Sequence, residues 1–294
     1  MAVWSGVLNV VIPLFAITSM FVVGARFTLS EILEPFRHWQ GSLLLLLANF
    51  VLVPLLGYGL AGWLLSAHAS LAIGLVLVAS AAGAPFLLQL TKAAQGNLML
   101  SSGLLLVLVL VTIATMPFLV PLLIPSAAVA APSIAIPLVL TMLLPLCVGA
   151  AIRQISIARA QQLWPLGARL AAIVFAVLIV LTFVLYAGDV AGLAGTGALA
   201  AAALLVAGAF GIGHVLGHIG GESRTEVGLA TAQRNIGAAT VVAVESFHDP
   251  DVLVMVVAAS LVTLAVLIPL SRTVARRSRL RFSPYPTSTN PESR

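Results

Sequence analysis

The residues with the greatest chemical potential stand together in one short run. The sequence TAQRN, at positions 231–235, places Thr231, Gln233, Arg234 and Asn235 inside an otherwise apolar segment. A guanidinium is permanently charged and offers five N–H donors in one plane, and the neighbouring amides add donors and acceptors. Such a group either faces a polar cavity where an anion can bind, or is neutralised by backbone carbonyls in a purely structural role. The surrounding elements decide between the two.

The composition of the chain is that of a membrane protein. Of its 294 residues, 61% are hydrophobic and 8% are charged, whereas a soluble domain carries about 25% charged residues. The basic residues lie mostly between apolar segments, so the net charge of +5 reflects membrane topology and predicts no nucleic-acid partner. The single cysteine, Cys147, excludes an intrachain disulfide.

Nine apolar segments predict an all-α polytopic protein, because backbone groups in lipid must satisfy their hydrogen bonds within a helix. The segments lack the alternation of membrane β-strands. They cover residues 4–25, 41–66, 70–91, 98–123, 134–152, 165–187, 192–219, 226–247 and 251–271.

The charges between the segments predict the orientation. Every one of the 14 Lys and Arg residues except Arg234 falls in alternate connections, at their margins or in the tail, whereas Asp189, Asp249 and Asp251 fall in the others. The positive-inside rule then places the N-terminus outside and the C-terminus in the cytoplasm of a multi-pass protein of the cell membrane. Without a basic region at its start, the first segment is expected to be a retained span. Residues 1–282 form the membrane domain, and the polar residues 283–294 are expected to be a disordered tail.

Two of the predicted spans are interrupted. Gly83 and Pro85 break the span at 70–91, and Gly237 follows the polar run in the span at 226–247. If the fold consists of two inverted halves, with the first helix of the first half missing, both spans hold the fourth place of their half. Interrupted spans at matching places indicate a transport site near the membrane midplane. Arg234 would lie roughly 12 Å deep, where an arginine costs at least ~2.5–3.5 kcal/mol.

Other polar residues within the spans are candidates for the same site. Asn49 and Gln89 are costly to bury, so they are expected to bind substrate together with the polar run, whereas Ser101 and Ser102 are weaker candidates for binding an ion. His214 and His218 have the spacing of a zinc pair, but no third ligand is evident. We therefore expect no metal and no cofactor.

Four stretches of the chain resemble the bile acid:sodium symporter family. They are MFVVGARFTLSEILEPFR, ANFVLVPLLGYGLA, VASAAGAPFLLQLTKAAQGNLMLSS and SRTEVGLATAQRNIGAATVVAVESFHDP. The resemblance implies the nine-span form of the family. It also implies a panel domain (about 4–25 and 134–187), a core domain (about 41–123 and 192–271) and two interrupted helices that cross beside the substrate crevice.

The resemblance also implies two sodium ions, but their ligands are largely missing here. A Ser-Asn pair of the family falls on Leu87 and Leu88, and its paired hydroxyls fall on Ser101 and Leu105. A family glutamine falls on Asn49. The family's acidic residue falls on Leu229 or Ala230, and a second glutamine falls on Gln233 or Arg234, depending on a one-residue slip. Neither alignment supplies a carboxylate, which makes sodium doubtful.

The expected function is secondary transport of a small organic anion by alternating access, with Arg234 as a fixed positive charge in place of sodium. Two alternatives stay open: a sodium-coupled symporter with a non-standard ion site, and an intramembrane sensor or enzyme. An enzyme would need catalytic groups that converge at one depth, and the sequence shows none. Neither the substrate nor an oligomeric state is indicated.

Overall fold

The structure is a computed structural model that describes residues 2–26, 39–125, 129–221, 223–247 and 249–281. The expected tail at 283–294 and the loop residue Arg37 lie outside these residues. The helices are α1 (Ala2–Arg26), α3 (Trp39–Leu47), α4 (Val53–Leu64), α5 (Ala69–Ser80), α6 (Leu87–Ala94), α7 (Leu98–Leu123), α8 (Ala131–Leu138), α9 (Leu144–Ile155), α10 (Ile157–Gly192), α11 (Ala198–Ile219), α12 (Arg224–Ala232), α13 (Ile236–Ser246) and α14 (Pro250–Arg281). Two π-helical turns, η2 (Ala48–Leu52) and η4 (Val139–Leu143), join α3 to α4 and α8 to α9.

Each predicted apolar segment corresponds to one helix or to a joined pair of helices. Within the described residues, six helical stretches are long and apolar enough to cross a membrane, and three shorter apolar helices accompany them. These observations confirm an all-helical, polytopic membrane protein; the count of nine spans stays a prediction. The last helix extends to Arg281, so it continues beyond the predicted apolar segment at 251–271 and carries Arg272 and Arg276.

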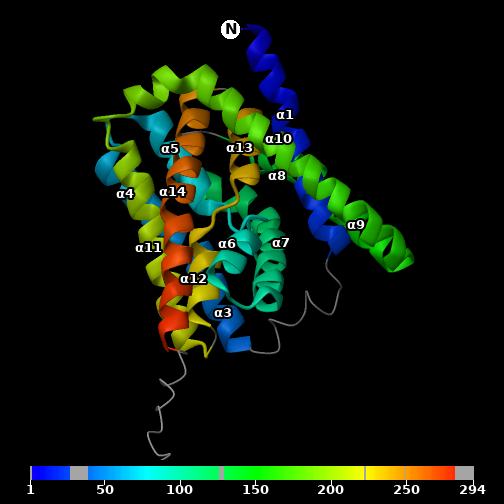
Figure 1. Cartoon of the computed structure of the whole chain (residues 1–294). Helices are drawn as coiled ribbons and strands as arrows, with labels where there is room; N and C mark the ends of the chain where they lie inside the picture. The colour runs from blue at the N-terminus through cyan, green and yellow to red at the C-terminus, as the bar shows by residue number, and fades with distance from the viewer. Residues whose placement is uncertain (1, 27–38, 126–128, 222, 248, 282–294) are drawn as a thin grey trace, which may run out of the picture.

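Helices α1, α9 and α10 pack mainly against one another and lie together on one side of the molecule (Figure 1). Two glycines bring α1 and α9 into backbone contact: a methyl group on Gly24 would lie 2.0 Å from the Leu146 carbonyl oxygen, and one on Gly149 would lie 2.3 Å from that of Phe21. On the other side, α5 packs against α4 and α14, and α11 against α12. Helix α8 contacts α7 and α13, so the segment formed by α8, η4 and α9 reaches both groups of helices.

An apolar cluster joins the two groups at one end of the molecule. Its buried members come from α1, α10, α13 and α14, and they are Ile12, Ala16, Leu178, Val241, Leu253 and Val257. All six side chains are at most 8% exposed. The cluster fills the space between α1, α10 and α14 on the side where α14 begins, away from Arg26 and Arg272.

The break between α5 and α6 depends on a glycine and a threonine. Gly83 has a φ of +76°, which is accessible to glycine without strain. Its Cα faces α7 so closely that a methyl group would lie 2.5 Å from the Val109 nitrogen. Thr112, also on α7, accepts from the Ala82 N–H and donates to the Ala82 carbonyl, both at 2.9 Å. The break is therefore anchored to α7 through both backbone groups of one residue, Ala82.

We expect Gly83→Ala to destabilise the protein more than Gly221→Ala. Gly221 also has a positive φ, +72°, but a methyl group there meets nothing within 4 Å, so its substitution isolates the backbone strain of about 1–2 kcal/mol. At Gly83 the overlap with α7 adds about 1–3 kcal/mol. Thermal melting of both variants in detergent measures the difference, and equal losses would contradict the close packing of the break.

Candidate functional site

The site is built where two interrupted helices cross. Helix α5 ends at Ser80 and α6 begins at Leu87, while α12 ends at Ala232 and α13 begins at Ile236. The two extended stretches pair in an antiparallel bridge between Ala82 and Arg234. This geometry confirms that both spans are interrupted and that they cross at their breaks.

Asn235 ties the two breaks together. Its backbone N–H donates to the Ala81 carbonyl at 2.9 Å, and its side-chain amide donates to the Gly83 carbonyl at 2.7 Å. Its side-chain oxygen accepts from the Ala238 N–H at 3.1 Å and caps the start of α13. Asn235 therefore holds the two extended stretches together and caps α13, and it also borders a cavity.

Arg234 lies at the centre of the crossing and is fully buried, with 0% exposure. Its Nε donates to the Val78 carbonyl (3.3 Å) and its Nη1 to Asn49 Oδ1 (2.8 Å) and the Thr231 carbonyl (3.0 Å). Its Nη2 donates to the carbonyls of Asn49 (3.5 Å) and Ala79. One bond from Nε and two from each terminal nitrogen use all five donors of the guanidinium.

The carbonyl of Asn49 is free for Arg234 because of a local irregularity in its own helix. Asn49 lies in the π-helical turn η2, in which the Val53 N–H bonds to the Ala48 carbonyl. The next residue, Pro54, has no N–H to donate. The usual helical donors to the Asn49 carbonyl are therefore missing, and the arginine replaces them.

The remaining carbonyls are available to Arg234 because two helices end at this point, and the Val78 carbonyl also accepts from the Ala81 N–H at 3.3 Å. Val78 and Ala79 belong to the last turn of α5, and Thr231 belongs to the last turn of α12. The final carbonyls of a helix have no partner within it and carry the negative end of its dipole. Two such helix ends converge on Arg234, and their partial negative charges compensate the positive charge of the guanidinium. No carboxylate is among the partners of Arg234 found in the described residues.

This arrangement corrects one expectation from the sequence. Arg234 was expected to face a polar cavity and to hold an anion directly. It borders the cavity, but it has no exposed surface and no donor left over. The physical reason is the desolvation of a buried charge, which demands that every N–H find an oxygen; the broken helices supply enough oxygens inside the protein.

Asn49 and Thr231 belong to the same network and not to the cavity wall. Both are 0% exposed. The Asn49 side chain donates to the Leu45 carbonyl (3.0 Å) and to the Thr231 hydroxyl (3.2 Å) while its oxygen accepts from Arg234. Both residues were expected to bind substrate, but the structure gives them the task of holding the guanidinium.

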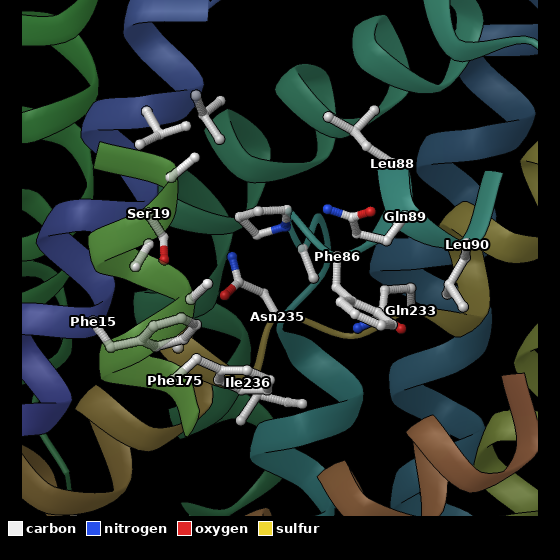
Figure 2. Close-up of a pocket in the computed structure, with 18 of the residues that line it drawn as sticks. Phe15, Ser19, Phe86, Leu88, Gln89, Leu90, Phe175, Gln233, Asn235 and Ile236 are labelled. Atoms are coloured by element: carbon white, nitrogen blue, oxygen red, sulfur yellow. The ribbon is translucent and has the colours of Figure 1, made fainter. Parts of the chain in front are cut away.

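A cavity of about 540 Å³ lies beside the crossing, between α1, α10 and α14. Figure 2 shows Phe15 and Phe175 at one side of it and the amides of Gln89 and Gln233 at the other, with Asn235 between them. The rings of Phe15 and Phe175 are stacked, with centroids 5.0 Å apart. Arg26, the last residue of α1, and Arg272, in the C-terminal part of α14, complete the lining.

Gln233 is a predicted site residue with an unused hydrogen-bond acceptor. It is 2% exposed, and its Oε1 is buried without a hydrogen-bond partner among the described residues. A buried acceptor with no partner is costly, so a donor from a bound solute would stabilise it. Gln89, which is exposed, faces the same cavity. These two amides are the predicted site residues best placed to contact a solute.

The aromatic and basic parts of the wall were not foreseen. In the sequence, nothing distinguishes Phe15, Phe86 and Phe175 from the other apolar residues of membrane spans. Ser19 is likewise a residue type that is common in membrane helices. Arg26 and Arg272 were assigned only to topology. No feature of the sequence sets these residues apart, because their role arises from the packing of α1 and α10 against the crossing.

Ser101 and Ser102 satisfy their hydrogen bonds away from Arg234. The Thr91 hydroxyl donates to Ser101 Oγ at 2.8 Å, and Ser102 donates to the Leu98 carbonyl of its own helix at 2.6 Å. No hydrogen bond found in the described part of the chain links either serine to Arg234. Their expected role in binding an ion stays a prediction.

Of the three predicted helix-breaking residues, two lie in a break. Gly83 and Pro85 fall between α5 and α6, but Gly237 lies in the first turn of α13, which is a correction. The helix restarts before Gly237 because Asn235 caps it. The histidines take other partners: His214 stacks on Phe210 (5.6 Å) and His218 Nδ1 lies 2.9 Å from Arg224 Nη2. No group of three metal-ligating residues is found in the described residues.

An all-helical membrane protein in which two broken helices cross beside a cavity has the architecture of a secondary transporter. The model of the sodium bile acid symporter family matches residues 13–193. The chain belongs to this family, and it is therefore a membrane transport protein and not an enzyme. No curated protein matches the chain. The match includes Asn49 and the break between α5 and α6, and it ends before Arg234.

We expect Asn49→Leu to reduce the free energy of unfolding by about 2–3 kcal/mol, because Arg234 Nη1 loses its side-chain acceptor and the Thr231 hydroxyl loses the donor that bonds to it. Gln40→Leu is the matched control: Gln40 is an exposed amide on α3, the helix that leads into η2, and its loss should change stability by less than about 0.5 kcal/mol. Thermal melting of the two purified variants compares them. Similar melting temperatures would show that Asn49 does not support Arg234.

Proposed function

We propose that this protein moves a small organic anion across the membrane by alternating access, without coupling to sodium. The observation that carries the proposal is the cavity beside the crossed breaks. Its wall includes aromatic rings, three side-chain amides and, besides the saturated Arg234, the two arginines Arg26 and Arg272. An apolar cluster lies at one end. A solute with an apolar body and an anionic group matches this wall.

The preference for an anion follows from the charges of the wall. Arg26 and Arg272 are the formally charged side chains that line the cavity apart from the saturated Arg234. The helices α6 and α13 also begin at the cavity, where Pro85, Phe86 and Ile236 form part of its lining. The start of a helix carries the positive end of its dipole and favours negative charge.

The apolar cluster indicates which conformation of the transport cycle the structure represents. The cavity lies between this cluster and the ends of α1 and α14, which the positive-inside rule places at the cytoplasm. The protein is then in its inward-facing state, with its N-terminus outside. To reach the opposite state, α1 and α10 must separate from α13 and α14 along Ile12, Leu178 and Leu253. The expected panel and core domains describe this movement.

The proposal of sodium independence rests on what occupies the expected ion sites. Leu87, Leu105 and Leu229 are at most 1% exposed and belong to the hydrophobic core, and aliphatic side chains offer no ligand to a hard cation. At the crossing, the carbonyls that could bind an ion are taken by Arg234. A sodium ion placed there would meet a like charge.

Uptake of organic acids into proteoliposomes tests the proposal. A panel of mono- and dicarboxylates should include a transported solute, and replacing a sodium gradient with choline should change its initial rate by less than about twofold, because no ion gradient is linked to the step. A rate that falls at least about tenfold without sodium would favour the sodium-coupled alternative. Absence of flux for every acid would reject organic anions as the substrate class.

Arg272→Gln should weaken binding of the transported anion. Loss of one charged contact of about 1 kcal/mol raises KM roughly fivefold. Arg276→Gln is the control, because Arg276 is exposed one helical turn further along α14 and is not among the residues of the cavity wall. Initial rates over a range of substrate concentrations give both constants. Equal effects of the two substitutions would point to a general surface-charge effect.

A further inference from the structure

The oxygens around Arg234 form a complete coordination shell for a cation. Five acceptors converge on one guanidinium, and all are neutral: four are main-chain carbonyls and the fifth is the side-chain oxygen of Asn49. They come from three elements that are far apart in the sequence, η2, α5 and α12. The shell surrounds a group that is 0% exposed.

The shell does not depend on the arginine for its existence. The main-chain carbonyls are positioned by the ends of α5 and α12 and by the π-helical turn before Pro54. The strands that carry them are fixed separately, by the bridge between Ala82 and Arg234 backbones, by Thr112 and by Asn235. Truncation of the Arg234 side chain removes none of these links, and it leaves five oxygens around an empty space that borders the cavity.

We infer that this shell is a cation-binding site which Arg234 fills as a covalently attached ligand, and that a free guanidinium ion binds in it once the side chain is removed. The planar ion has the same donor directions as the arginine head group. It reaches the site through the adjacent cavity, which Arg234 already borders.

The inference has a consequence for transport, and that part rests on the proposed function. A cation attached to the chain cannot be released on either side of the membrane, so its binding cannot be linked to an ion gradient. In the truncated variant, the same position would be filled by a diffusible ion. Transport would then depend on the concentration of that ion, through linkage between the two binding events.

The test is chemical rescue of Arg234→Ala, measured first by thermal melting of the purified protein in detergent. The variant should melt at least roughly 5 °C below the wild type. Guanidinium chloride at about 20 mM, far below denaturing concentrations, should restore at least half of that difference. Urea, which has a similar planar shape without the charge, and sodium chloride at the same concentration should restore much less.

Two matched variants complete the design. Arg234→Lys keeps a cation in the shell and should not respond to guanidinium. Arg224→Ala removes an exposed arginine of α12 that contacts His218, and it should neither melt early nor respond. If Arg234→Ala does not respond, if it responds equally to sodium chloride or urea, or if it stays unfolded with guanidinium present during purification, the inference is wrong.

Uptake by the Arg234→Ala variant provides the second readout. With the substrate identified for the wild type, the initial rate should rise at least about threefold on addition of guanidinium, whereas the wild-type rate should not change. If guanidinium restores the melting temperature but not the uptake rate, the cation site is supported and its role in transport is rejected. Failure of wild-type uptake for every acid, with melting rescued, would reject the proposed substrate class and leave the cation site standing.

Discussion

The stability of the crossing depends on the burial of one guanidinium, because the acceptors gathered there are filled by Arg234. A charge within the membrane is tolerated only if its donors find acceptors, and Arg234 needs five. Intact helices keep their carbonyls for themselves, so the acceptors exist only because α5 and α12 stop in the membrane domain and because η2 departs from the α-helical pattern. The crossing, its bridge and the position of Asn49 together bring these acceptors to one point.

Much of the fold could be predicted, because membrane helices leave a strong pattern in the sequence. The segment at 98–123 coincides with α7, and Gly83 with Pro85 marked the first break correctly. The second break was found from its polar run, but its limit was misplaced by the reliance on Gly237. A side-chain cap ends the extended stretch there, and capping by Asn235 depends on a backbone conformation that the pattern of apolar residues does not reveal.

The sequence predicted which polar residues lie together at the crossing, but it did not predict what each of them does. Arg234, Asn49 and Thr231 were correctly grouped, since buried polar residues in membrane helices seek one another. The sequence did not reveal that the guanidinium would be saturated, because its main partners are carbonyls, which every residue has. The cavity wall was missed for the opposite reason: Phe15 and Phe175 are apolar residues in apolar helices, and only packing assigns them a surface.

A coordination shell made largely of main chain has an evolutionary consequence. Substitutions at Val78 or Ala79 change side chains but leave the coordinating main-chain oxygens in place as long as the end of α5 persists. Family profiles record side chains. A single codon change could therefore replace a diffusible ion with an arginine side chain. The protein would still be recognised as a family member, although its transport would no longer be coupled to that ion.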